Sequence, residues 1–206
     1  YAAFSDGTIT WQKNLGEGNF SAPYLISTSA MGANSVYAAD INGDGYTDVI
    51  SASTMDNKIA WYENNGFEIF TEHIISTAAI HAQSVYAIDM DGDDDIDVLS
   101  ASYSNDSITW HENDGSGYFG SEHVISNNAT GAKSVYAVDM DGDNDIDVLS
   151  ASVLDDKVAW YENLGGQAFL EHAISTDALS AQSVYAVDMD GDDDIDVLSA
   201  SWLNDT

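Results

Sequence analysis

The feature that most constrains this chain is an internal repeat. The tetrapeptide Ser-Val-Tyr-Ala occurs at residues 35–38, 84–87, 134–137 and 183–186, so successive copies are 49 or 50 residues apart. In each complete copy three segments follow in a fixed order, as at residues 48–53 (DVISAS), 59–64 (IAWYEN) and 70–76 (FTEHIIS). A repeat of this period is typical of architectures in which each unit is one small supersecondary structure that packs against its neighbours.

Each repeated segment has the character of a β-strand. The segments are short, rich in β-branched and aromatic residues, and bounded by Gly, Asn, Asp or Ser, and no stretch has a helical period. Four strands in a unit of this length predict an all-β fold, a β-propeller built from four-stranded antiparallel blades. We expect one domain over residues 1–206, with repeat units at about 1–34, 35–83, 84–133, 134–182 and 183–206.

The number of blades has two interpretations. The chain begins just before a third-strand segment and ends just after a second-strand segment. It therefore holds enough strands for four blades, but its two ends fall in the middle of a repeat unit. The terminal strands would close a ring of four blades by pairing with each other, or the chain would be part of a larger propeller. We expect the larger propeller, with seven blades, because both ends fall in the same loop of the repeat and the first residue is not Met.

The charge balance excludes several partners. The chain has 36 acidic residues against 4 Lys and Arg, a formal net charge of −32. Nucleic acids and anionic membrane surfaces are bound through clusters of Lys and Arg, which are missing here. No apolar run is long enough to cross a membrane, and with no Cys the chain has neither disulfides nor thiolate metal ligands. Repulsion of this size predicts bound cations.

The acidic residues are concentrated in four loops, each placed between the first two strand segments of a unit. Twenty of the 36 lie at residues 40–48, 89–97, 139–147 and 188–196. Oxygen ligands at positions 1, 3, 5 and 9 suit a hard cation, and calcium accepts such a set more readily than magnesium. A Gly at position 4 permits the sharp bend. The loop is not an EF-hand, whose Gly is at position 6 and whose flanks are helices.

These loops, together with the flanking segments, resemble the FG-GAP/VCBS repeats, the calcium-binding blades of integrin alpha-chain propellers. The resemblance covers nearly the whole chain and implies one Ca²⁺ in each loop, four in all. In the family the side chains at positions 1, 3, 5 and 9 and the carbonyl at position 7 hold the ion. The first loop, with Asn42 and Tyr46, carries less charge, and we expect it to bind weakest. The implied ligands are Asp40, Asn42, Asp44, Tyr46 and Asp48; Asp89, Asp91, Asp93, Asp95 and Asp97; Asp139, Asp141, Asp143, Asp145 and Asp147; and Asp188, Asp190, Asp192, Asp194 and Asp196.

Two other repeated features have structural interpretations. A tryptophan recurs at one register of the third-strand segment (Trp11, Trp61, Trp110, Trp160), and its regular spacing favours packing between blades over a carbohydrate platform. Glu-His pairs recur on the fourth segment, where repetition favours a structural polar contact over a catalytic base or a zinc site.

Positions that differ between otherwise similar repeats are candidates for ligand contact, because the scaffold does not fix them. Alternating strand direction places such positions on the face opposite the acidic loops, where the loops of propellers usually carry function. The candidates are His81, Tyr103, Lys133 and Trp202.

The sequence predicts a non-catalytic, secreted or cell-surface propeller that binds a glycan or protein ligand, with calcium in a structural role. Two alternatives remain: an accessory propeller of a secreted polysaccharide-degrading lyase or hydrolase, and a self-associating filament or sheath protein. No catalytic residues stand apart from the repeat.

Overall fold

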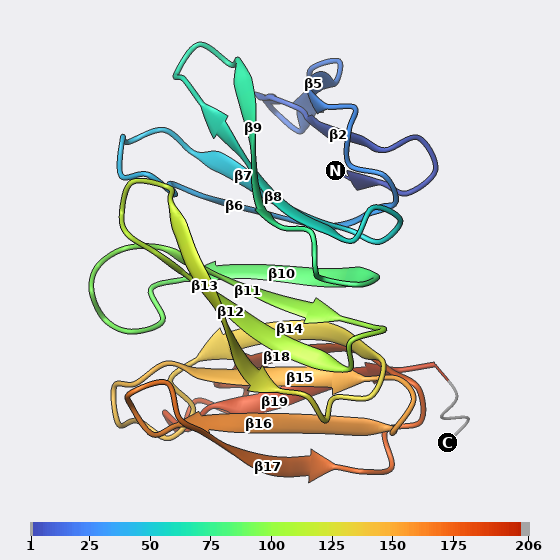
Figure 1. The fold of residues 1–206 in the computed structure, drawn as a ribbon, viewed down its shortest axis with the longest axis vertical. Helices are drawn as coiled ribbons and strands as arrows, with labels where there is room; N and C mark the ends of the chain where they lie inside the picture. The colour runs from blue at the N-terminus through green and yellow to red at the C-terminus, as the bar shows by residue number, and fades with distance from the viewer. Residues whose placement is uncertain (1, 203–206) are drawn as a thin grey trace.

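The computed structural model describes residues 2–202, and all of their regular structure is β-strand (Figure 1). Three four-stranded antiparallel sheets form the body, each with its strands in chain order. Their strands are β6 (Ala33–Ala39), β7 (Asp48–Ser53), β8 (Lys58–Asn64) and β9 (Phe70–Ser76); β10 (Ala82–Ile88), β11 (Asp97–Ser102), β12 (Ser107–Asn113) and β13 (Phe119–Ser126); and β14 (Ala132–Val138), β15 (Asp147–Ser152), β16 (Lys157–Asn163) and β17 (Phe169–Ser175).

Smaller sheets lie at the two ends. A three-stranded sheet contains β1 (Ala2–Ala3), β2 (Thr8–Trp11) and β5 (Tyr24–Ser27). Among the described residues β18 (Ala181–Val187) pairs only with β19 (Asp196–Ser201). A hairpin of β3 (Asn14–Gly16) and β4 (Asn19–Phe20), which the repeat did not predict, projects between β2 and β5. All-β, blade-like units are therefore confirmed.

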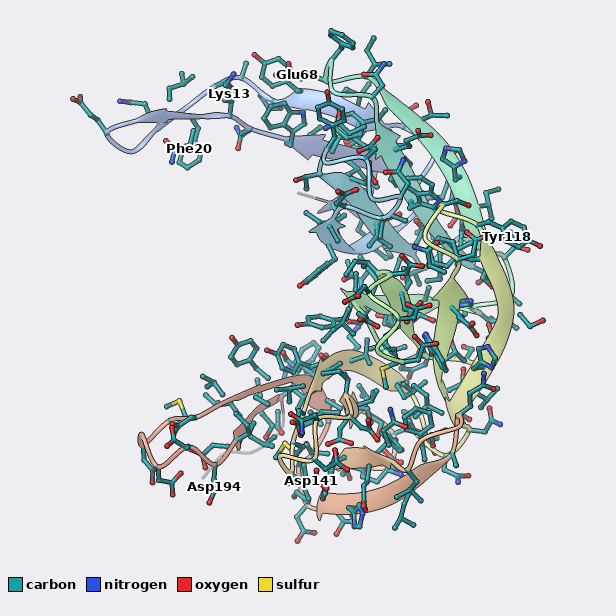
Figure 2. The ribbon with its side chains drawn as sticks, turned by 90° about the vertical axis from the view of Figure 1, so that its left-hand side faces the viewer. Lys13, Phe20, Glu68, Tyr118, Asp141 and Asp194 are labelled. Atoms are coloured by element: carbon teal, nitrogen blue, oxygen red, sulfur yellow. The ribbon has the colours of Figure 1, made fainter. Side chains whose placement is uncertain are left out.

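The sheets stack face to face along an open arc, with β6, β10, β14 and β18 as neighbours on its inner side (Figure 2). Within the described residues the terminal strands do not pair: β1, β2 and β5 form one sheet, and β18 and β19 another. The four-bladed ring considered from the sequence is therefore wrong for this structure. The two partial blades instead lie at the two ends of the arc (Figure 2).

The core lies between successive sheets. In β11 and β15 all six residues of the DVLSAS segment are buried, because both faces of the sheet are covered by neighbours. The same segment in β19 is mostly exposed, since no third strand or further sheet covers it among the described residues. Between the second and third complete sheets, Leu99, Ile108 and Trp110 pack with Val135 and Val148 of the next sheet.

The Ser-Val-Tyr-Ala repeat has a structural explanation in the inner strands. The Ser84 hydroxyl accepts a hydrogen bond from the Val135 backbone N–H of the next blade at 3.4 Å, and Ser35 and Ser134 do the same for the next strands at 3.3 Å. The tyrosines form a ladder from Tyr37 to Tyr185, with ring centroids 4.7–4.9 Å apart. Both contacts tie blade to blade and cover strand edges that would otherwise offer unpaired groups.

No helix in residues 2–202 is long and apolar enough to cross a membrane.

Candidate metal centre

The acidic loops join the first two strands of each blade, and the structure brings their carboxylates together. In three loops, one oxygen from each of positions 1, 3 and 9 lies within 4.8 Å of the other two. The triads are Asp89, Asp91 and Asp97; Asp139, Asp141 and Asp147; and Asp188, Asp190 and Asp196. Three carboxylates at this spacing form an oxygen-only set that suits a hard divalent cation.

Backbone N–H groups shape the loop around the position-1 carboxylate. In the second loop Asp89 accepts hydrogen bonds from Gly92 at 2.8 Å, Asp93 at 3.2 Å and Asp94 at 2.9 Å. The position-5 carboxylate of Asp93 instead accepts one from the Asp95 N–H at 2.9 Å, and it lies outside the triad. The structure therefore gathers three of the four predicted side-chain ligands.

Two loop positions take left-handed backbone conformations. The predicted bend at position 4 is present, as in Gly92 with φ of 79°. Position 6 also has positive φ: 73° at Asp94, 75° at Asn144, 70° at Asp193 and 87° at Gly45 of the first loop. Asp and Asn adopt this conformation more readily than other residues with a side chain. That restriction to Gly, Asn and Asp is a signal that the sequence analysis missed.

The position-9 aspartate is the buried end of the site in the three complete blades, whereas Asp196 of the last loop is not buried. Asp97 is 0% exposed, and its two oxygens accept backbone hydrogen bonds from Asn113 at 2.8 Å and Met90 at 3.0 Å. Burial raises the pKa of Asp97 to about 7, against the lowering effect of these bonds, and burial also raises the pKa of Asp48 and Asp147. A buried carboxylate that favours a proton when alone is well suited to exchange that proton for a cation.

The position-3 carboxylate faces a glutamate of the third strand. Burial raises the pKa of Asp91, and the nearby charges of Asp93 and Glu112 raise it further. Glu112 lies 3.3 Å from His123 Nε2, and the His123 ring packs on Trp110 with centroids 4.7 Å apart. In each complete blade the histidine of the repeated Glu-His pair thus contacts a glutamate of the third strand, rather than the glutamate beside it in the sequence, and packs on the repeated tryptophan. Trp110 is 3% exposed and is part of the core, as the packing interpretation expected.

The first loop has a different donor set. Asn42 replaces the position-3 aspartate, and its Nδ2 lies 3.4 Å from Asp44 and 3.5 Å from Glu63. Asp40 accepts hydrogen bonds from the backbone of Asp44 and Gly45, so the loop keeps the shape of the other three. Its position-7 residue, Tyr46, packs against Gly66, where a Cβ would lie 2.4 Å from the ring.

A link between successive loops was not predicted. Asn113, at the end of β12, donates from Nδ2 to the Ile96 carbonyl of its own loop at 2.9 Å and to the Ile41 carbonyl of the preceding loop at 2.7 Å. The recurrence of Asn at this position was the available signal. The bonds fix the orientation of two neighbouring loops.

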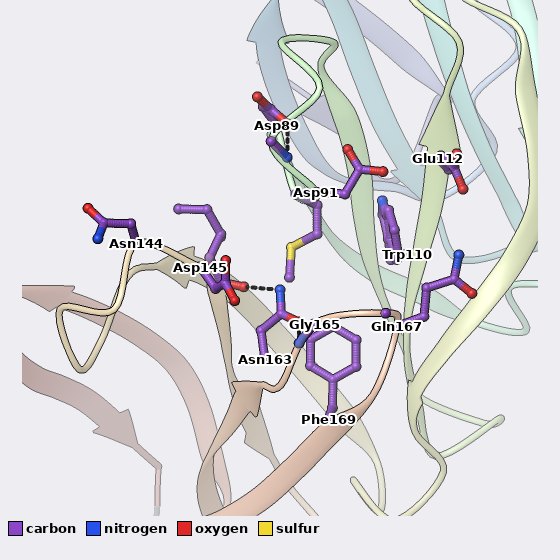
Figure 3. Close-up of a pocket in the computed structure, with 14 residues that line it drawn as sticks. Asp89, Asp91, Trp110, Glu112, Asn144, Asp145, Asn163, Gly165, Gln167 and Phe169 are labelled. Atoms are coloured by element: carbon purple, nitrogen blue, oxygen red, sulfur yellow. Dashed lines mark hydrogen bonds between the residues drawn. The ribbon is translucent and has the colours of Figure 1, made fainter.

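A cavity of about 470 Å³ opens between the blade of β10–β13 and the blade of β14–β17 (Figure 3). One wall carries Asp91, Trp110 and Glu112 of one blade, and the opposite wall carries Asp145 and Phe169 of the next. Asn144, Asn163 and Gln167 add amide groups, and none of the described residues that line the cavity is a lysine or an arginine. This cavity could not be predicted from the repeat, because its walls come from two units.

Of the four ligand-face candidates, His81, Tyr103 and Trp202 lie in loops opposite the acidic ones, and Lys133 lies at the start of β14. The Tyr103 N–H donates to the His81 carbonyl at 3.2 Å, and Gln83 links the His81 carbonyl (3.2 Å) to Lys133 Nζ (2.6 Å). Trp202 is 78% exposed and donates from its N–H to the Ser180 carbonyl, two blades away from His81. The structure therefore brings three of the four together.

Contacts of the scaffold account for part of the variation at these positions. Where the loop before the first strand has glycine, a large side chain covers it, as Met55 covers Gly32 and Leu154 covers Gly131. At the equivalent place in another blade, His81 Nδ1 lies 2.6 Å from Ser104 Oγ. Residues that differ between repeats thus differ in compensating pairs.

Comparisons with known proteins agree with this fold. No curated protein matches the chain. Similar solved structures include a lectin from Agrocybe aegerita described as recognising non-reducing terminal N-acetylglucosamine (20% identity, TM-score 0.63, covering 92% of this chain and 54% of the lectin). A functionally unknown protein from Desulfotomaculum acetoxidans (12%, TM-score 0.59, 90% and 55%) and a V. cholerae biofilm matrix protein (21%, TM-score 0.49, 94% and 31%) are also similar.

This chain spans about half the length of the first two of these proteins and 31% of the third. The FG-GAP-like repeat pattern matches it four times, over residues 1–51, 40–100, 89–150 and 139–199. The first match includes one acidic loop, and each of the other three includes two. The chain therefore belongs to the FG-GAP-like repeat family.

Proposed function

We propose that this chain is a calcium-stabilised recognition module that binds a neutral glycan. The observation that carries the proposal is the cavity between the blades of β10–β13 and β14–β17. The carboxylates of Glu112 and Asp145 and the nearby amides suit the hydroxyl groups of a sugar, and the half-buried Phe169 offers apolar surface to its C–H faces. An anionic ligand is disfavoured by the absence of lysine and arginine among the described lining residues and by the net charge of −32.

Calcium has a structural role in this proposal. Each acidic loop would hold one ion through positions 1, 3, 5 and 9 and the carbonyl of position 7, the first loop most weakly. If the dissociation constants are about 10⁻⁴–10⁻³ M, 1 mM calcium contributes roughly 0.4–1.4 kcal/mol per site. Four sites then supply a few kcal/mol, a large part of the stability of a typical domain.

The module binds rather than catalyses and acts outside the cell, where calcium is abundant. Residues 1–206 belong to one propeller domain, and further blades of a seven-bladed propeller cover the exposed faces of β18 and β19. The lectin similarity supports the fold on which this proposal rests.

The test is a glycan array read with calcium and with a chelator, followed by two matched variants. Asp145→Asn removes a carboxylate from the cavity wall but leaves the position-7 carbonyl, and it should weaken glycan binding. Asp95→Asn makes the same change in the preceding loop, where the side chain packs on Gly115 outside the cavity, and it should leave binding unchanged. Equal effects of the two variants, or no glycan bound, would refute the proposed site.

A further inference from the structure

One blade departs from its neighbours where the third strand faces the fourth. In the blade of β6–β9, Tyr62 on β8 lies directly opposite Glu72 on β9. The blade of β14–β17 repeats this pair with Tyr161 and Glu171. In the blade between them, β12 carries His111 at this register, opposite Glu122 on β13. The substitution places an imidazole where the repeat has a phenol.

The same blade has lost the cation that neutralises this glutamate. Lys58 Nζ lies 2.6 Å from Glu72, and Lys157 Nζ lies 2.7 Å from Glu171. The equivalent residue of β12 is Ser107. No ion pair with a lysine is made by Glu122 within residues 2–202, and burial raises the pKa of its carboxyl group.

His111 is itself incompletely satisfied. It is 2% exposed, and its Nε2 has no hydrogen-bond partner among the described residues. Glu122 Oε2 lies 3.9 Å from this nitrogen. Burial, with a smaller effect of His123, lowers the pKa of His111 to about 4, so the ring is neutral at physiological pH. A neutral imidazole has one nitrogen with a free lone pair.

We propose that His111 Nε2 and Glu122 Oε2 hold a divalent transition-metal ion such as Zn²⁺, in a site separate from the acidic loops. With bonds of about 2.0–2.2 Å at a tetrahedral angle, zinc holds a nitrogen and an oxygen about 3.4 Å apart. The two atoms lie 3.9 Å apart, so binding the ion requires them to approach by about 0.5 Å. The Glu122 side chain is 35% exposed, so water can complete the coordination. Imidazole suits zinc, whereas calcium favours oxygen ligands, so the two kinds of site select different ions.

The contacts that join fourth-strand histidines to third-strand glutamates are less suited to this role; His123, for example, lies 3.3 Å from Glu112. His73 and His172 already lie 2.9 and 2.7 Å from glutamates and stack on tryptophans. A metal there would have to replace a formed hydrogen bond, whereas at His111 it supplies a missing partner.

The experiment is a calorimetric titration of the whole chain with Zn²⁺ in saturating calcium. The wild type should show a zinc site that His111→Tyr removes. This variant carries the tyrosine of the neighbouring blades, and its calcium-bound melting curve checks that it folds. His172→Gln is the matched control, which removes a histidine that already has a partner and should leave this site intact.

A second variant keeps His111 in place. Ser107→Lys supplies the ammonium group found in the neighbouring blades, and it should weaken zinc binding by about tenfold or more while preserving the fold. A crystal grown in calcium and soaked in zinc should give an anomalous peak between His111 and Glu122. Zinc binding unchanged in His111→Tyr, or a peak only at other histidines, would overturn the proposal.

Discussion

Acidification should stabilise the calcium-free protein, and the buried Asp97 is the main reason. Its pKa is raised to about 7 by burial in the folded state, against about 3.9 in an unfolded chain. Below pH 7 the folded state therefore binds a proton that the unfolded state does not. The resulting stabilisation is complete below about pH 3.9 and is lost as the pH rises through about 7.

The magnitude follows from the linkage relation. A difference of one proton between the two states changes the free energy of unfolding by about 1.4 kcal/mol per pH unit. In EDTA, the step from pH 7 to pH 5.5 should thus add on the order of 1–2 kcal/mol from this residue alone. Asp48 and Asp147 have pKa values raised in the same direction and add to the effect.

Denaturant titrations in EDTA at pH 7.5, 6.5 and 5.5, repeated in calcium, measure this directly. In calcium the trend should reverse, because protons compete with the ion for the same oxygens. Asp97→Asn is the control: it cannot titrate, so its slope in EDTA should be shallower than that of the wild type, which separates Asp97 from the general relief of charge repulsion. Equal slopes for the two proteins would refute the role assigned to Asp97.

Three further outcomes are expected. Asp91→Ala should lower the calcium stoichiometry in calorimetry without abolishing the fold, because the other loops are intact; an unchanged stoichiometry would contradict its place in the triad. Asp94→Ala should lower the free energy of unfolding by about 1 kcal/mol, whereas Asp94→Gly should not, because φ is 73° there; equal effects in a urea titration would argue against backbone strain. Leu99→Ala should cost about 2–5 kcal/mol by denaturation, since Leu99 is fully buried, and Leu198→Ala at the same repeat position, 38% exposed, should cost distinctly less.

The strands could be predicted because each one is specified locally. Alternating and β-branched segments bounded by turn residues recur in every unit, and the repeat itself indicates that the units pack on each other. The open arc could not be predicted in the same way. Whether β19 meets β2 depends on the geometry of stacking over the whole chain rather than on any one segment.

In the candidate metal centre, too, some features could be predicted from the sequence and others depend on packing between units. The carboxylates at positions 1, 3 and 9 follow from spacing, because alternate residues of a bent loop converge. The burial of Asp97, which gives the site its affinity for protons, depends on the neighbouring sheet and on Asn113. The cavity beside it has walls from two units, so neither unit's sequence indicates it.

Variation between repeats has two meanings that only the structure separates. Gly32 with Met55, and Gly131 with Leu154, vary together because one side chain fills the space that the glycine leaves. Such pairs preserve the scaffold, so difference alone does not identify a ligand contact. The change at His111 is not compensated in this way. Its Nε2 is buried without a hydrogen-bond partner among the described residues. The neighbouring strand β13 has the glutamate of the other blades, Glu122, but β12 has Ser107 where the other blades have lysine. An uncompensated difference of this kind costs stability, and a bound ion that offsets the cost is therefore the physical reason to look for function there.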